Sequence, residues 1–204
     1  VLYNDILSFN CEIATALLQS PKGVFTETCA LNLLQRVPGR VYQTIIEDNF
    51  EDIYYPREEN RLIDTVIQNI SFLNDDERAS AYYVLFQSCM IKRPFNIFHR
   101  RNLNLRTSFI KANFGNKTTW EQSFESLFVK FTQELNEFQF AVLPRVEVSN
   151  MSALHCDREA DLVYIDTPYF REKQSAAITY HNRYHFLEGL MHYEDIPEQI
   201  NNEK

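Results

Sequence analysis

Glycine is scarce in this chain of 204 residues, and its four glycines are too far apart to form a Gly-x-Gly sequence. The sequence therefore contains no glycine-rich loop of the kind that lets backbone amides approach a phosphate group. Long apolar runs are also missing, because no stretch approaches the roughly 18 residues that cross a membrane. Nothing at the start resembles a signal peptide. We therefore expect no membrane partner.

Cysteines spaced for a metal or a redox pair are absent as well. The four cysteines are scattered without a Cys-x-x-Cys sequence, which favours free thiols in a reducing cytoplasm over disulfides or a zinc site. A hydrophobic content of 45% and a charged content of 24% are typical of a globular protein with one core, or one core plus an inserted lobe. Because the chain begins at Val1 and not at methionine, we expect a segment upstream of it.

Acidic residues are absent from Arg78 to Trp120, although the whole chain carries a net charge of −8. This basic segment (78–120) holds eight lysines and arginines. Such segregation indicates phosphate contact, and the interleaved aromatic and amide side chains could stack on bases or hydrogen-bond to them. A solvated basic face without a partner is the simpler alternative. The candidates for DNA contact are Lys92, Arg93, Arg100, Arg101, Arg106 and Lys117.

Hydrophobic periodicity predicts strands that alternate with helices. We expect strands near 1–3, 146–148 and 161–165, and helices near 8–20, 62–73, 74–90, 119–138 and 183–193. Ser8 could cap the first helix, and capping boxes at 74–77 and 119–122 could open two others. This order predicts an α/β fold with a doubly wound, mostly parallel sheet. A mostly helical basic lobe over 55–140 would interrupt a core made of 1–54 and 141–204.

The stretch from Asp161 to Phe170 is the part of the sequence that most strongly indicates a functional site. Apolar residues typical of a buried strand run into Asp166, a proline-fixed corner and Tyr169. Ligands of open α/β sheets bind outside the carboxyl ends of the strands, where Asp5 is also expected. An ordinary strand-to-loop exit is the plain alternative.

These residues resemble the adenine-specific DNA methyltransferases of the Dam-like group, in which a target-recognition lobe lies between the cofactor motifs and the catalytic motif. The family's Asp-Pro-Pro-Tyr signature stands here as Asp166-Thr167-Pro168-Tyr169. Segments at 92–96, 114–120 and 184–190 are also similar, and the resemblance spans most of the chain. It implies a Rossmann-like core, S-adenosylmethionine as cofactor and double-stranded DNA as substrate. A cognate restriction endonuclease is a further candidate partner.

The resemblance also implies catalytic roles. The carboxylate of Asp166 would accept one hydrogen of the adenine amino group, and the carbonyl of Thr167 would accept the other. Tyr169 would stack on an adenine that has left the duplex. Threonine replaces the family's usual proline at position 167, which makes the backbone less rigid at that residue. Pro168 still favours an extended conformation of Thr167.

The cofactor site that the resemblance implies is less complete. Asp5 would bind the ribose hydroxyls and Ile6 would pack against the cofactor's adenine. Asn4, Met151, Ser152 and Asp166 would complete the site, with Ser152 where the family often has an acid. The glycine-rich loop of this fold precedes the ribose-binding acid by about 20 residues, which places it upstream of Val1.

Two other interpretations stay open. His181, His185 and Glu188 fall at i, i+4 and i+7 and could bind a metal in a hydrolase, although a solvated helix surface explains them more simply and we expect no metal. A catalytically degenerate relative would bind duplex DNA without methyl transfer. A Cys-His nucleophile pair is not supported, because His155 and Cys156 are neighbours that point to opposite sides of an extended chain.

Overall fold

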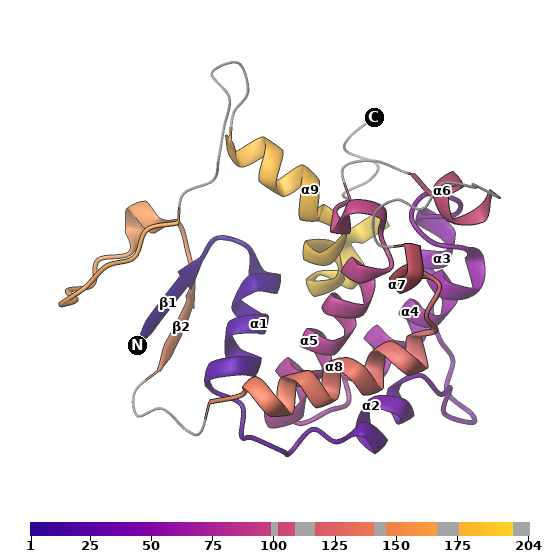
Figure 1. The fold of residues 1–204 in the computed structure, drawn as a ribbon, viewed down its shortest axis with the longest axis horizontal. Coiled ribbons are helices and arrows are strands. Elements are labelled where there is room, and N and C mark those ends of the chain that lie inside the picture. Colours follow the sequence, from indigo (N-terminus) through magenta and orange to yellow (C-terminus); the bar gives the residue numbers. More distant parts are fainter. Residues whose placement is uncertain (99–101, 109–116, 141–145, 167–175, 198–204) are drawn as a thin grey trace.

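The computed structural model describes residues 1–98, 102–108, 117–140, 146–166 and 176–197, in which two short strands stand beside a body of helices (Figure 1). The strands are β1 (Leu2–Asp5) and β2 (Glu147–Asn150). The α-helices are α1 (Ser8–Leu18), α2 (Glu27–Leu33), α3 (Ile45–Asn49), α4 (Arg57–Ile70), α5 (Asp75–Ile91), α6 (Asn104–Thr107), α7 (Lys117–Trp120), α8 (Phe124–Phe138) and α9 (Ala176–Met191). Short 3-10 helices are η1 (Pro94–Asn96), η2 (Ala153–His155) and η3 (Tyr193–Asp195).

The two strands pair in parallel, with Leu2 opposite Glu147 and Asp5 opposite Asn150. A parallel pair needs a long crossover, which the helices between the strands provide. Helix α1 starts directly after β1 and lies against both strands (Figure 1). The carboxyl ends of β1 and β2 therefore meet beside the start of α1.

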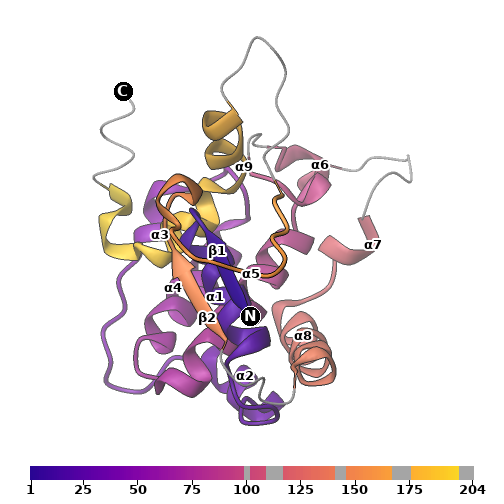
Figure 2. The same cartoon turned by 90° about the vertical axis from the view of Figure 1, so that its left-hand side faces the viewer.

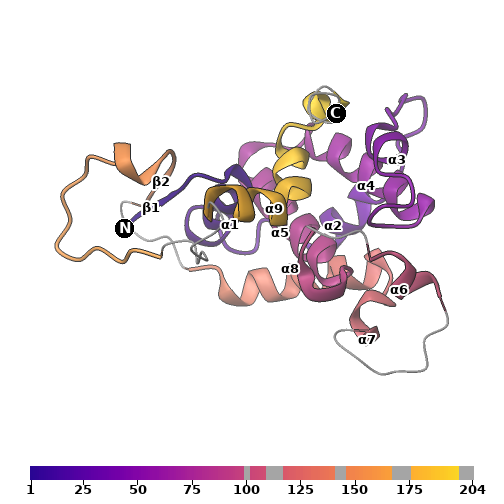
Figure 3. The same ribbon diagram turned by 90° about the horizontal axis from the view of Figure 1, so that it is seen from above.

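The hydrophobic core lies among the helices. Helix α5 runs through its middle and packs against α1, α4 and α8 (Figures 1 and 3). Phe86 of α5, Phe128 of α8 and Phe186 of α9 are almost completely buried. One continuous cluster of buried side chains extends from Leu7 to Ile196, so the predicted lobe and the predicted core contribute to the same cluster. None of the described helices is long and apolar enough to cross a bilayer.

Two of the three predicted helix caps are wrong. At α5 the predicted N-cap is confirmed, because the Asn74 side chain accepts a hydrogen bond from the Glu77 N–H at 3.0 Å. The Glu77 carboxylate accepts from the side-chain Nδ2 of Asn74 at 2.8 Å. Helix α8 begins later than expected, with the Ser123 hydroxyl accepting from the Ser126 N–H at 3.2 Å, because the chain turns between α7 and α8. Ser8 lies inside α1, and the N-cap position is Leu7, which has no capping side chain.

A buried acid holds α3 against α4. The Glu47 side chain is only 4% exposed and accepts from Arg57 Nε at 2.6 Å and from Arg61 Nη2 at 2.7 Å. These two arginines lower the pKa of Glu47 to about 2. The Asp64 side chain of α4 caps the start of α3, because it accepts from the Ile46 N–H at 2.8 Å.

The predicted strand over 161–165 is wrong for this structure. These residues have no regular secondary structure, and Leu162, Val163, Tyr164 and Ile165 are 64–88% exposed. A buried parallel strand needs neighbours beside it and helices on both of its faces. In the described residues the sheet consists of the parallel pair β1–β2 alone. The described part of the chain is therefore mostly helical with a small parallel sheet, and it does not form the predicted doubly wound sheet.

Candidate cofactor-binding edge and basic segment

Asp5 lies at the carboxyl end of β1, where the chain turns into α1 (Figure 2). Its Oδ1 accepts a hydrogen bond from the Leu7 N–H at 2.8 Å, and its Oδ2 accepts from Asn10 Nδ2 at 3.0 Å. The Tyr3 hydroxyl donates to Oδ2 at 3.4 Å. Burial, and then the charge of Asp5, raises the pKa of Tyr3 to about 12, so this hydroxyl keeps its proton at neutral pH. These contacts fix the orientation of the Asp5 carboxylate.

Side-chain amides join the ends of the two strands. Asn4 Nδ2 donates to the Met151 carbonyl at 3.0 Å, and Asn4 Oδ1 accepts from Ser149 Oγ at 2.8 Å. Asn150 Nδ2 donates to the Asp5 carbonyl at 3.0 Å. The structure therefore brings Asn4 and Asp5 to the same edge as Met151.

Apolar surface is available at this edge. Ile6 is 68% exposed and Met151 is 41% exposed. Ser152 follows Met151, and its hydroxyl accepts from the Leu154 N–H at 3.4 Å. An oriented carboxylate beside exposed apolar side chains suits a nucleoside, because the sugar hydroxyls can donate to the acid while the base packs on the apolar surface.

Glu188 of α9 caps the N-terminal end of α1 beside this edge. Its Oε1 accepts from the Ser8 N–H at 2.9 Å, and its Oε2 accepts from the Phe9 N–H at 3.2 Å. The first N–H groups of a helix have no partner within the helix, and the adjacent Leu7 cannot supply one. Glu188 therefore performs the capping role from a distant part of the sequence.

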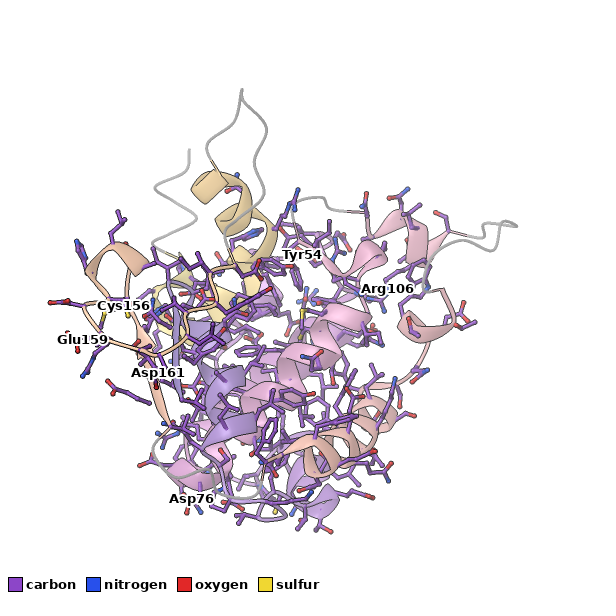
Figure 4. All side chains as sticks on the ribbon, turned by 60° about the vertical axis from the view of Figure 1, so that its left-hand side comes forward. Tyr54, Asp76, Arg106, Cys156, Glu159 and Asp161 are labelled. Atoms are coloured by element: carbon purple, nitrogen blue, oxygen red, sulfur yellow. The ribbon has the colours of Figure 1, made fainter. Side chains whose placement is uncertain are left out.

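The predicted catalytic corner falls mostly outside the described residues. Asp166 is exposed and is the last described residue of the irregular stretch that follows η2, whereas Thr167, Pro168 and Tyr169 are not described. Seen from above, the 151–166 stretch extends beyond the strands, away from the helical body (Figure 3). Asp161 and Glu159 lie on the same stretch (Figure 4). The role of the four residues at 166–169 stays a prediction.

Lys92 and Arg106 of the basic segment are engaged inside the protein. Their side chains are 3% and 8% exposed, and both bind the carboxylate of Glu59 on α4. Lys92 Nζ lies 2.8 Å from Glu59 Oε1, and Arg106 donates to both Glu59 oxygens at 2.8 Å. The interpretation of 78–120 as one basic surface is therefore corrected at these two residues.

Arg93 is also buried. Its Nη1 donates to the Tyr54 carbonyl at 3.0 Å, and its guanidinium lies 4.7 Å from the centre of the Tyr54 ring and 5.6 Å from that of Phe98. Burial lowers the pKa of Arg93. In this structure Arg93 stabilises the aromatic cluster around Tyr54 instead of facing solvent. Of the other DNA-contact candidates, Arg100, Arg101 and the side chain of Lys117 lie outside the described residues.

The described side chains of the alternative metal site have other partners. His185 lies 2.8 Å from the Tyr54 hydroxyl through Nε2 and 2.8 Å from the Asn182 carbonyl through Nδ1. Glu188 caps α1, and the His181 side chain is not described. Within the described ranges, no group of three His, Cys, Asp or Glu residues is arranged to hold a metal.

Sequence reasoning missed Glu59, and it considered Glu188 as a possible metal ligand but not as a helix cap. Each contacts residues far away in the chain, so no local motif reveals its role.

Comparison with curated proteins finds a relative. The chain is 26% identical over 180 residues to the type II methyltransferase M2.HphI of Haemophilus parahaemolyticus. The match covers 83% of this chain and 52% of that protein, so the chain spans about half the length of the curated relative. No protein-family model and no solved structure matches significantly. The similarity supports a relationship to methyltransferases without identifying the methylated base.

Proposed function

We propose that the protein transfers a methyl group from S-adenosylmethionine to the exocyclic amino group of adenine in double-stranded DNA. The observation that carries this proposal is the similarity to a type II methyltransferase over 83% of the chain. The sequence Asp166-Thr167-Pro168-Tyr169 supports adenine as the target, through its resemblance to the family signature.

The carboxyl ends of β1 and β2 fit the cofactor by the chemistry of their side chains. Asp5 has a fixed carboxylate for the ribose hydroxyls, and Ile6 and Met151 offer apolar surface for the adenine ring. Asn4, which precedes Asp5, and Ser152, which follows Met151, add polar side chains at the same strand ends. When bound, S-adenosylmethionine supplies a methyl group made electrophilic by its sulfonium sulfur. The protein's task is to hold the acceptor nitrogen in line with that methyl group.

Asp166 has the central chemical role in this proposal. The adenine amino nitrogen is a poor nucleophile, because its lone pair is delocalised into the ring. A carboxylate that accepts one amino hydrogen and a carbonyl that accepts the other favour the pyramidal nitrogen that attacks. Asp166 and the Thr167 carbonyl would provide these acceptors, and the negative charge of the one and the dipole of the other would stabilise the positive charge that develops on the nitrogen. As the N–CH3 bond forms, the S–CH3 bond breaks, S-adenosylhomocysteine leaves, and the nitrogen gives up a proton to Asp166 or to water.

The target base must leave the helix to reach these acceptors. Unstacking costs a few kcal/mol, and stacking on Tyr169 offsets part of that cost. The basic segment supplies positive charge for the DNA phosphates, and the remaining candidates are Arg100, Arg101 and Lys117, whose side chains lie outside the described residues.

The test is transfer of a labelled methyl group from S-adenosylmethionine to duplex DNA by the protein and by an Asp166→Ala variant. We expect label on the DNA with the unaltered protein and at least about a 100-fold lower rate with the variant. An equal rate in the variant would overturn the assignment of Asp166. Duplex binding without any transfer would instead favour the catalytically degenerate relative.

A further inference from the structure

We propose that Glu59 is a positioning residue for DNA recognition, which holds α6 and α7 of the basic segment in place through Lys92 and Arg106. We call Glu59, Lys92, Arg106 and the Trp120 carbonyl the Glu59 clamp. The inference rests on the proposed function, because it assigns the basic segment to DNA contact. It changes the role of Lys92 and Arg106 from phosphate contact to support.

The ion pairs of the clamp join three parts of the chain. Glu59 lies in the first turn of α4, Lys92 follows α5 and Arg106 lies in α6. Arg106 Nη1 donates to Glu59 Oε2 and Nη2 donates to Oε1, both at 2.8 Å, while Lys92 Nζ lies 2.8 Å from Oε1. The planar guanidinium thus binds the carboxylate with two parallel hydrogen bonds, which fixes direction as well as distance.

The same cations also hold the end of α7. Lys92 Nζ donates to the Gln122 carbonyl at 2.6 Å and to the Trp120 carbonyl at 3.3 Å. Arg106 Nη2 reaches the Trp120 carbonyl at 3.5 Å. Trp120 is itself 3% exposed. One carboxylate therefore anchors α6 directly, and anchors the end of α7 through the cations that it pairs.

Burial makes the clamp sensitive to the loss of Glu59. The Glu59 side chain is 20% exposed, and the side chains of Lys92 and Arg106 are 3% and 8% exposed. Lys92 and Arg106 are thus two buried cations that share the carboxylate of Glu59. The guanidinium of Arg106 also lies 5.8 Å from the centre of the buried Tyr55 ring. Charges in such a place need their partner, so removal of the acid drives the cations toward water and releases α6 and α7.

Glu59→Gln distinguishes support from phosphate contact, because the two roles predict opposite results. If Lys92 and Arg106 touched phosphates, removal of the competing acid would strengthen DNA binding. The clamp predicts that the dissociation constant for duplex DNA rises about tenfold or more, because α6 and the end of α7 lose their placement. The exposed neighbour Glu58 is the matched control, since Glu58→Gln makes the same change of charge on the same turn.

Arg106→Lys is the second variant, and it keeps the charge while losing the two-bond pairing. The clamp predicts weaker DNA binding, because α6 is no longer held in one direction. Phosphate contact predicts nearly unchanged binding, because a lysine still neutralises a phosphate. Lys92→Met completes the set: the clamp predicts that it weakens DNA binding as Glu59→Gln does, whereas phosphate contact predicts opposite effects of these two variants.

The experiment is titration of fluorescent duplex DNA at several salt concentrations, with the folded fraction of each variant measured by circular dichroism. A role in stability alone would lower the folded fraction and leave the dissociation constant of the folded protein unchanged. Unchanged binding by folded Glu59→Gln and Arg106→Lys would overturn the clamp alone. If Glu59→Gln does not fold, Arg106→Lys decides. Absence of duplex binding by the unaltered protein would overturn the proposed function and this inference together.

Discussion

Replacement of Glu188 by alanine is expected to destabilise the protein at the edge where the cofactor is proposed to bind. Its two oxygens accept from the Ser8 and Phe9 N–H groups at 2.9 and 3.2 Å. A capping interaction contributes about 0.5–2 kcal/mol, and a negative charge near a helix start adds about 0.3–1 kcal/mol. Because Glu188 is only half-buried, we expect a loss of about 2 kcal/mol for Glu188→Ala and about 1 kcal/mol for Glu188→Gln.

Urea unfolding, followed by far-ultraviolet circular dichroism, measures this loss. Glu194→Ala is the matched control, because Glu194 is exposed near the end of α9 and the substitution removes the same charge. The control should stay within about 0.5 kcal/mol of the unaltered protein. A Glu188→Ala variant as stable as the control would refute the view that α9 caps α1.

Three further results are expected. Because the folded-state pKa of Glu47 is lowered to about 2 from an ordinary 4.5, its ionised form stabilises the protein above pH 4.5, and this contribution is lost as the pH falls toward 2. Urea unfolding from pH 7 to pH 2.5 should therefore show a smaller pH-dependent loss in Glu47→Gln, and an equal loss would contradict the assignment. Arg93→Met should lower the free energy of unfolding by about 3 kcal/mol in the same assay, because it removes a buried hydrogen bond and two ring contacts. A change below about 0.5 kcal/mol would count against a structural role of Arg93. Iodoacetamide should alkylate the partly exposed Cys156 in the native protein but not Cys89, which is fully buried and whose pKa is raised by burial. Mass spectrometry measures the labelling of each cysteine, and equal labelling of the two would contradict the described packing.

Local patterns predicted the approximate positions of α1, α4, α5, α8 and α9, because amphipathic spacing acts over short distances. The apolar face of α4 and the Asn74 cap of α5 are examples. The parallel pairing of β1 with β2 was also implied by the alternation of strands and helices.

Long-range charge pairing was not predictable from the sequence. Lys92 and Arg106 looked like surface cations, because nothing near them in the chain indicates that Glu59 would bury them. The strand expected at 161–165 failed for a related reason. Strand propensity describes the residues themselves, whereas a strand also needs a neighbouring edge, and the described sheet consists of β1 and β2.

The identity of the methylated base tests the central claim most directly. DNA treated with the protein and S-adenosylmethionine can be digested to nucleosides and analysed by mass spectrometry, beside DNA treated with Asp166→Ala. We predict methyladenine carrying the added group on its exocyclic nitrogen, and its near-absence with the variant. Methylcytosine as the product, or methyladenine at the same level with Asp166→Ala, would contradict the account.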